Sequence, residues 1–324
     1  MKKTVIAAVA AAVMMAVSSG SALAADKFPT HALTMICPWG AGGGSDAQLR
    51  YVAGLMEKEL GQPIKVVNQT GGGGAVGWSA LARAKPDGYT LGQLTAELAM
   101  DHWITPAVKV NYKDFDPLAL LNEDPATVTI SATAPYKTYE EFVAYLKANP
   151  GKVRGGATSV GGIWHVAMGQ WLESIGLPVT AITYIPTSGS AEAYKEMAAG
   201  GIDACFTSVA ESATMYKTGK AIGLAVMSDK RDDKFPDIPT MAEKGTPITV
   251  GTWRGIGLPK GVPAERREII MNALKKAVND PSYLKFMEDR GFGVKYLEGD
   301  DFYKYMEESD TNLGKSLKAL GLAK

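Results

Sequence analysis

The sequence predicts an α/β protein of two lobes, in which each lobe is a mostly parallel β-sheet flanked by helices and a ligand cleft lies between the lobes. Short β-rich runs alternate with amphipathic helices, which is typical of parallel sheets. Glycine-rich loops follow several of these runs, at the sheet edge where α/β proteins bind ligands. The pattern changes after Pro117 and changes back near Trp253. We therefore expect one lobe at 25–122 plus 251–324 and an inserted lobe at 123–250.

The first lobe is expected to begin with a strand at Leu33–Cys37, followed by a helix that opens at Ser45. Apolar residues recur at helical spacing along this segment, and Gly61 ends it. Ser45 and Gln48 stand three apart, as in a capping box. Further elements follow in order: a strand at 64–67, a helix at 76–84 and a strand beginning at 89–92.

The inserted lobe repeats the alternation of short strands and helices. Strands are expected at 126–131, 153–157, 181–185, 203–206 and 222–227, and helices at 138–148, 164–175 and 191–199. From Trp253 onward longer helices are expected, at 264–279, after Pro281 and at 300–320. Because the chain would cross between the lobes twice, the two crossings make a natural hinge.

Residues 1–24 have the features of a cleaved signal peptide. Lys2 and Lys3 precede an unbroken apolar stretch from Val5 to Val17, and Ala22-Leu23-Ala24 supplies the small residues of a cleavage site. The alternative is a membrane anchor, but the apolar stretch is shorter than the about 20 residues that a span needs. We expect a periplasmic protein.

Charge and cysteine content exclude several kinds of partner. The chain has 34 Lys+Arg and 34 Asp+Glu, without the basic excess of a nucleic-acid binder. Cys37 and Cys205 are the two cysteines. A disulfide between them would restrain the hinge, so two buried free thiols are favoured over a bridge. The 3 histidines and 2 cysteines show no metal-ligand spacing, and no metal is expected.

The first glycine-rich loop, Pro38–Asp46, leads directly into the first helix. Its glycines leave backbone N–H groups open to a ligand, and the helix N-terminus that follows favours an anion. Trp39 is expected to form a wall of the pocket. For Asp46 two roles stay open, helix capping and contact with the ligand.

The second loop, Thr70–Gly77, also precedes a helix. It satisfies G-x-G-x-x-G, and Glu97 follows at the spacing of a dinucleotide fingerprint. It also resembles a phosphate loop, except that Trp78 replaces the lysine. Without that lysine, and in an exported protein, nucleotide binding is disfavoured. No cofactor is expected.

Two further loops and a pair of hydroxyl residues belong to the inserted lobe. Thr158–His165 and Pro186–Ser190 offer glycines and hydroxyls, and Thr207-Ser208 follows a strand of its own. For His165 two roles stay open, a structural hydrogen bond at the helix entry and contact with the ligand.

These loops contain no convincing catalytic set. Ser45, Ser159 and Ser188 lie in no G-x-S-x-G elbow. No second histidine in the sequence is an obvious catalytic partner for His165. Anion-ready loops without a nucleophile–base pair indicate a binding protein rather than an enzyme.

Several motifs together resemble one family, the extracytoplasmic receptors of tripartite tricarboxylate transporters, known as the TctC or Bug family. The resemblance runs nearly from end to end and is specific as a combination. The segments that carry it are Pro38–Asp46, Asn68–Gly74, Pro86–Leu91, Ser228–Arg231, Phe235–Thr240, Glu243–Gly245, Trp253–Gly255 and Pro259–Pro263.

The resemblance implies a type II periplasmic-binding-protein fold that closes around a small carboxylate and hands it to membrane permease subunits. It places the first two loops on one wall of the cleft and the loops of the inserted lobe opposite. The candidate ligand-binding residues are Trp39, Gly40, Ala41, Gly42, Gly43, Gly44, Ser45, Asp46, Thr70, Gly71, Gly72, Gly73, Gly74, Ser159, Val160, Gly161, Gly162, His165, Thr187, Ser188, Gly189, Thr207 and Ser208. The receptor is expected to be monomeric.

This sequence departs from the family's pattern at three places, so the identity of the ligand stays open. Trp39 stands where the family more often has Phe or Tyr, Ile185–Gly189 lacks the family's basic residue, and Ile163-Trp164 replaces small residues. The extra tryptophan would favour an aromatic or larger apolar acid. Two other functions stay as alternatives: a sensor that presents its ligand to a membrane signalling protein, and, with less support, a hydrolase or oxidoreductase.

Overall fold

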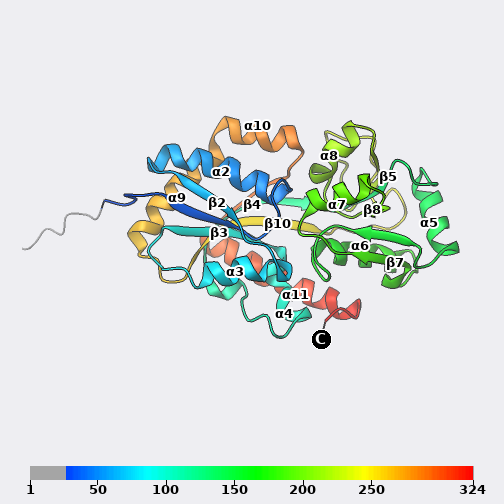
Figure 1. Cartoon of the computed structure of the whole chain (residues 1–324), viewed down its shortest axis with the longest axis horizontal. Coiled ribbons are helices and arrows are strands. Elements are labelled where there is room, and N and C mark those ends of the chain that lie inside the picture. Colours follow the sequence, from blue (N-terminus) through cyan, green and yellow to red (C-terminus); the bar gives the residue numbers. More distant parts are fainter. Residues whose placement is uncertain (1–26, 324) are drawn as a thin grey trace, which may run out of the picture.

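The computed structural model describes residues 27–323, which form two β-sheets lying side by side along the molecule (Figure 1). The expected signal peptide at 1–24 lies outside the described residues. Within the described range, no helix has both the length and the hydropathy to cross a membrane. The predicted two-lobed α/β class is confirmed, and each sheet is mixed around a parallel core.

The first lobe is built on a six-stranded sheet. Its strands lie in the order β11 (Val294–Glu298), β4 (Phe115–Pro125), β10 (Gly251–Pro259), β3 (Thr90–Thr95), β1 (Leu33–Cys37) and β2 (Ile64–Asn68). β1 runs parallel to β2 and β3, whereas β10 runs antiparallel to β3 and β4. Leu33 and Met35 of β1 are fully buried, as expected for a central strand covered on both faces.

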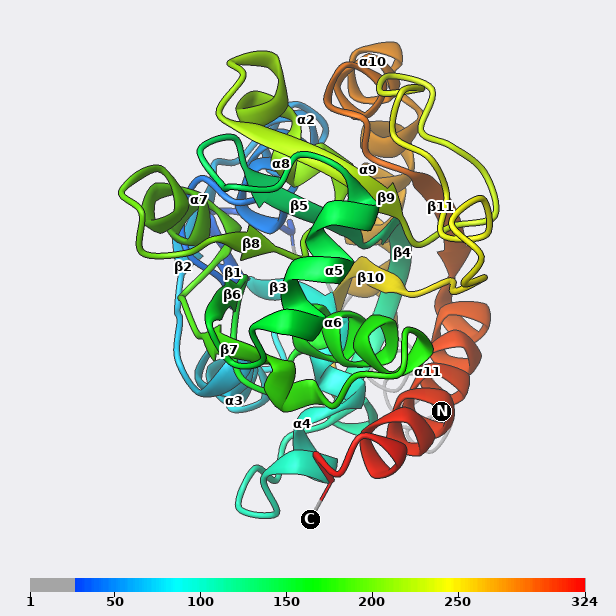
Figure 2. The same cartoon turned by 90° about the vertical axis from the view of Figure 1, so that its right-hand side faces the viewer.

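Helices cover both faces of this sheet (Figures 1 and 2). One face carries α2 (Gly44–Leu60), α9 (Ala264–Asn279) and α10 (Pro281–Arg290), and the other carries α3 (Ala75–Ala82) and α11 (Gly299–Ala319). The short helix α4 (Asp101–Ile104) follows β3. The far end of α11 also reaches the second lobe, where the Nε2 of Gln170 donates to the Oγ of Ser316 over 2.8 Å.

The second lobe is built on a five-stranded sheet in the order β7 (Ile182–Ile185), β6 (Val153–Gly156), β8 (Ala204–Cys205), β5 (Thr127–Ser131) and β9 (Ala221–Val226). β6 runs parallel to β7 and β8, and β5 runs antiparallel to β8 and β9. Its helices are α5 (Tyr139–Ala148), α6 (Ile163–Ser174), α7 (Ser190–Ala198) and α8 (Val209–Lys217). The long side chains Trp171, Phe142 and Phe206 are fully buried at its core.

The chain crosses between the sheets twice, and the two crossings are hydrogen-bonded to each other. The N–H of Ala126 donates to the carbonyl of Val250 over 2.8 Å, and the N–H of Met227 donates to the carbonyl of Ala126 over 2.8 Å. β4 continues through the expected boundary at residue 122 to Pro125, and β10 begins at Gly251. The division into lobes at 122/123 and 250/251 stays a prediction.

The three helices expected after Trp253 are confirmed as α9, α10 and α11, but the strands β10, before α9, and β11, between α10 and α11, were not expected. β4 and α8 also have no counterpart among the expected elements. Glycine explains β10: a Cβ at Gly255 would lie 2.3 Å from the ring of Phe302 and 2.6 Å from the carbonyl of Ala119. A Cβ at Gly257 would lie 2.7 Å from the side chain of Leu94 on β3. Close neighbours thus require glycine at these positions of the strand, which removes the usual β-branched signal.

The two cysteines are buried free thiols, one in each sheet. Burial raises the pKa of Cys37 to about 12 and the pKa of Cys205 still further. Since the thiolate is the reactive form, neither thiol is poised for modification.

We expect a thiol-reactive disulfide dye to label the native protein very slowly at neutral pH. After denaturation without reductant it should release colour equivalent to both cysteines. Fast labelling of the native protein would contradict the described burial, and no labelling after denaturation would indicate a disulfide.

Candidate functional site

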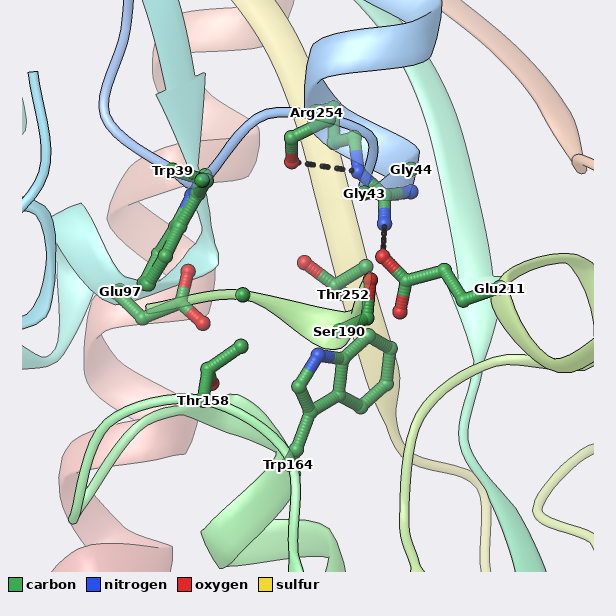
Figure 3. A pocket seen from close by; sticks show the side chains of 13 residues that line it. Trp39, Gly43, Gly44, Glu97, Thr158, Trp164, Ser190, Glu211, Thr252 and Arg254 are labelled. Carbon is green, nitrogen blue, oxygen red and sulfur yellow. Dashed lines mark hydrogen bonds and ion pairs between the residues drawn. The ribbon is translucent and has the colours of Figure 1, made fainter. Parts of the chain in front are cut away.

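A buried pocket lies where the two lobes meet, and in this closed arrangement the space inside it is about 20 Å³ (Figure 3). Both lobes contribute to its walls. The first lobe supplies Trp39, Gly40, Gly43, Gly44, Ser45, Glu97, Thr252 and Arg254, and the second supplies Thr158, Trp164, Gly189, Ser190 and Glu211. Its largest side chains are almost inaccessible, with Trp39 8%, Trp164 3% and Arg254 2% exposed. A ligand in it would be enclosed by both lobes.

Four helices of this pocket begin at its walls. Gly44 opens α2, Trp164 lies in the first turn of α6, Ser190 opens α7, and Glu211 lies in the first turn of α8. The first N–H groups of a helix have no acceptor within the helix, and the helix dipole makes this end partly positive. Four such ends from two lobes therefore give the pocket the character of an anion site.

The first glycine-rich loop is held in place by Asp46. Its carboxylate accepts from the N–H of Gly42 over 2.9 Å, from the Nε of Arg50 over 2.9 Å and from the Nδ2 of Asn68 over 2.8 Å. Although burial opposes it, these bonds lower the pKa of Asp46 below its usual value. The expected capping box of Ser45 and Gln48 is wrong, because α2 has Gly43 at its N-cap and no side-chain cap.

Ser45 instead accepts from Arg254, the buried cation at the centre of the site. The Nε of Arg254 donates to the Oγ of Ser45 over 3.1 Å, and its Nη1 donates to Asn122 and Asp124, each over 2.5 Å. Its Nη2 donates to the Oε1 of Glu211 over 3.0 Å, so the guanidinium joins the two lobes. Burial works against the charge, yet Asp124 and Glu211 raise the pKa of Arg254 above its usual value.

Glu97 on the opposite wall also bridges the lobes. Its Oε1 accepts from the N–H of Ile163, at the start of α6, over 3.3 Å. Its Oε2 accepts from the Oγ1 of Thr95 over 2.7 Å, and Thr95 in turn accepts from the Nε1 of Trp39 over 3.3 Å. Burial raises the pKa of Glu97, and the bond from Thr95 opposes that rise.

The lobes are closed on each other around the pocket. The N–H of Gly40 donates to the carbonyl of Ser188 over 3.0 Å. A Cβ at Gly44 would lie 2.7 Å from the Oε1 of Glu211, and a Cβ at Gly43 would lie 3.0 Å from the Oγ of Ser190. Glycine at these two positions therefore permits the close approach of the second lobe.

The structure brings only part of the expected residue set to the pocket. Trp39, Gly40, Gly43, Gly44, Ser45 and Gly189 line it. Asp46, in the first turn of α2, does not line it, and neither do the residues of the adjoining loops, Ala41, Gly42, Ser159, Val160, Gly161, Gly162 and Ser188. The residues of the second loop, Thr70, Gly71, Gly72, Gly73 and Gly74, do not line it either. This loop meets the second lobe at Gly73, whose Cβ would lie 3.4 Å from the Oγ of Ser159.

The remaining expected residues make internal contacts. The Nδ1 of His165 accepts from the N–H of Gly161 over 2.9 Å, and burial lowers the pKa of His165 to about 4. Thr187 donates to the carbonyl of Ala157, Thr207 bonds Tyr194 over 2.7 Å, and Ser208 accepts from the N–H of Glu211 over 3.3 Å as the N-cap of α8. In this structure the contacts of His165 are those of a structural histidine.

Seven pocket residues are absent from the expected set: Glu97, Thr158, Trp164, Ser190, Glu211, Thr252 and Arg254. Thr158, Trp164 and Ser190 lie within the expected loops Thr158–His165 and Pro186–Ser190, and Arg254 lies in a motif that carries the family resemblance, so the sequence did point to the segments that hold these four residues. Glu97 stood out only as part of a dinucleotide pattern. Nothing in the local sequence indicates Glu211 or Thr252.

Replacement of Arg254 by Met should lower the free energy of unfolding by about 3–5 kcal/mol, because Asp124 and Glu211 would stay buried without their cation. Urea denaturation at neutral pH measures this. The matched control is Arg231→Met, which breaks an exposed ion pair with Glu243 and should cost far less. Equal losses in the two variants would show that the buried carboxylates do not depend on Arg254.

Comparisons with known proteins agree with this geometry. A model described as tripartite tricarboxylate transporter family receptor matches residues 48–322. A UPF0065 protein from the gbd 5′ region of Cupriavidus necator is 30% identical over 98% of this chain and 96% of its own length. The periplasmic binding protein BugD superposes with a TM-score of 0.86 at 26% identity, covering 92% of this chain and 100% of BugD.

A further solved structure shares the fold. MatC of Rhodopseudomonas palustris, solved with bound malate, has a TM-score of 0.82 at 24% identity and covers 90% of this chain and 100% of its own. With the family model spanning most of the sequence, the chain belongs to the receptor family of tripartite tricarboxylate transporters, the TctC or Bug family, whose members are binding proteins rather than enzymes.

Proposed function

We propose that this protein captures a small organic acid in the pocket between its lobes, in the periplasm, and delivers it to the membrane subunits of a tripartite transporter. The observation that carries the proposal is the meeting of four helix N-termini from both lobes at one buried pocket. Backbone N–H groups at such ends bind carboxylates without a cationic side chain. The acid group is expected at Gly43, Gly44 and Ser45 of α2 and at Ser190 of α7.

The narrowness of the pocket favours a small ligand. In this closed arrangement the space open to a water-sized molecule is about 20 Å³, room for about one water, so the lobes must part to admit a ligand and only a compact one fits between them. MatC, which has the same fold, holds a small dicarboxylate. A compact acid is therefore the class of molecule to test first.

Closure of the lobes would report occupancy to the transporter. The described contacts across the cleft, between Arg254 and Glu211 and between Gly40 and Ser188, belong to a closed arrangement. A ligand that touches both lobes binds the closed form better and shifts the population toward it. A monomer suffices for this action, because one chain supplies both walls.

A thermal-shift screen of the mature protein against acetate, malate, adipate, citrate and the common amino acids tests the proposal. A ligand at a hundred times its Kd should stabilise the folded state by about 2.7 kcal/mol and raise Tm. If no acid of any class raises Tm, the proposed function is wrong.

Gly44→Ala should weaken binding of the acid that gives the largest shift by about tenfold or more, because the added methyl meets the Glu211 carboxylate when the lobes close. Isothermal titration calorimetry measures the change. The control is Gly54→Ala on the same helix, where an added Cβ meets nothing within 4 Å, and its affinity should match the wild type. Unchanged affinity in Gly44→Ala would place the ligand outside this pocket.

A further inference from the structure

We propose that the ligand is a zwitterion, a small molecule with an N–H-bearing cationic group beside its acid group, and that Glu97, Glu211 and Thr158 hold the cationic end. This inference rests on the function proposed above and names the class of acid. It follows from the charges, the hydrogen-bond roles and the aromatic walls of the pocket.

The charged side chains of the pocket give it an excess of acid. Glu97, Glu211 and Arg254 line it, and Asp124 lies directly behind Arg254. Arg254 is matched by Asp124 at 2.5 Å and by Glu211 at 3.0 Å. Glu97 therefore has no cation of its own among the pocket residues. A ligand with acid groups alone would meet two carboxyl groups at short range in a site of low dielectric, which is unfavourable.

The hydrogen bonds around Glu97 make it an acceptor. The indole N–H of Trp39 can only donate, so Thr95 accepts from Trp39 and gives its own proton to the Oε2 of Glu97. The other oxygen accepts from the backbone N–H of Ile163. Both oxygens thus receive donors, which favours the ionised carboxylate and opposes the burial that raises the pKa of Glu97.

Two buried polar atoms at the pocket, the Oε2 of Glu211 and the Oγ1 of Thr158, have no well-aligned hydrogen bond among the described residues. Burial raises the pKa of Glu211, and the nearby hydroxyl of Ser190 opposes that rise. The side chain of Glu211 is 5% exposed, and Thr158 as a whole residue is also 5% exposed. A buried acceptor left without a donor costs free energy. A ligand N–H group supplies the donor that the Oε2 of Glu211 needs, which a ligand carboxylate cannot do, whereas the hydroxyl of Thr158 can pair with either group because it both donates and accepts.

The aromatic walls also suit a cation. Figure 3 shows Trp39 beside Glu97 and Trp164 at another side of the pocket, with the carboxyl groups of Glu97 and Glu211 facing the space from opposite sides. An indole face attracts a cation, more strongly where water is excluded. Carboxyl groups and indole rings that surround one small space are well suited to bind an ammonium group.

The pocket leaves a separate place for the acid end. Glu97 already occupies the start of α6 through Ile163, and Glu211 adds its negative charge to the first turn of α8. The Glu211 carboxylate also faces Gly44 at the start of α2, whereas Gly43 just before it faces the hydroxyl of Ser190 at the start of α7, so the place left for the acid end is at Gly43 and Ser190. A ligand with its acid group at α2 and α7 and its nitrogen toward Glu97 and Glu211 matches both ends.

Calorimetry on the mature protein with matched pairs of acids tests the inference: glutamate with glutarate, aspartate with succinate, alanine with propionate, and 5-aminopentanoate with pentanoate. In at least one pair the amino member should bind about tenfold tighter or more, the effect of a charged hydrogen bond. Trimethylation of the nitrogen in that ligand should weaken binding, because it removes the N–H donors.

The variant Glu97→Gln keeps the shape of the side chain and removes its charge. It should lose about tenfold or more in affinity for the amino member while affinity for the nitrogen-free partner stays equal or rises. A purely structural role would weaken both members alike. Glu173→Gln, on the exposed side of α6, is the control and should change neither, and circular dichroism with urea denaturation confirms that each variant is folded.

Two results overturn the inference. If nitrogen-free acids bind as tightly as their amino partners or more tightly, the zwitterion is wrong and the organic-acid receptor stands. If neither member of any pair binds and no acid raises Tm, the receptor function and the zwitterion both fall.

Discussion

The closed form of this protein depends on one buried cation. Arg254, in the long strand β10, reaches α2 through Ser45, β4 through Asn122 and Asp124, and the second lobe through Glu211. A guanidinium that is 2% exposed is stable only because carboxylates surround it. One of these carboxylates, that of Glu211, belongs to the opposite lobe. Separation of the lobes would therefore break its ion pair with Arg254. The same ion pair therefore couples the pocket to the lobe arrangement.

This coupling also determines the chemistry of the pocket. Arg254 uses its donors on protein acceptors, so the positive character that remains comes from helix N-termini rather than from a free side chain. Glu97 and Glu211 then give the other end of the pocket a negative character. The family fold supplies the two lobes and the helix ends, while these side chains distinguish one kind of acid from another.

Local signals in the sequence were sufficient for much of the fold and for part of the site. β1, α2 and α9 follow from periodic apolar residues and from turn residues such as Gly61, because these signals lie within each element. β4 and β10 do not, since β4 carries Pro117 and a polar end, and β10 has glycines where residues distant in sequence, such as Phe302 at Gly255 and Leu94 at Gly257, pack closely onto it. Glu97, Glu211 and Arg254 meet only through tertiary packing, so spacing along the chain could not bring them together.

The crystal structure of the protein with its highest-affinity acid tests the central claim most directly. We expect the acid group at the N-termini of α2 and α7, the molecule enclosed between Trp39 and Trp164, and the ion pair of Arg254 with Glu211 intact. A ligand seated on the Thr70–Gly74 loop or outside the cleft would contradict this account. So would a liganded structure in which Arg254 and Glu211 are apart.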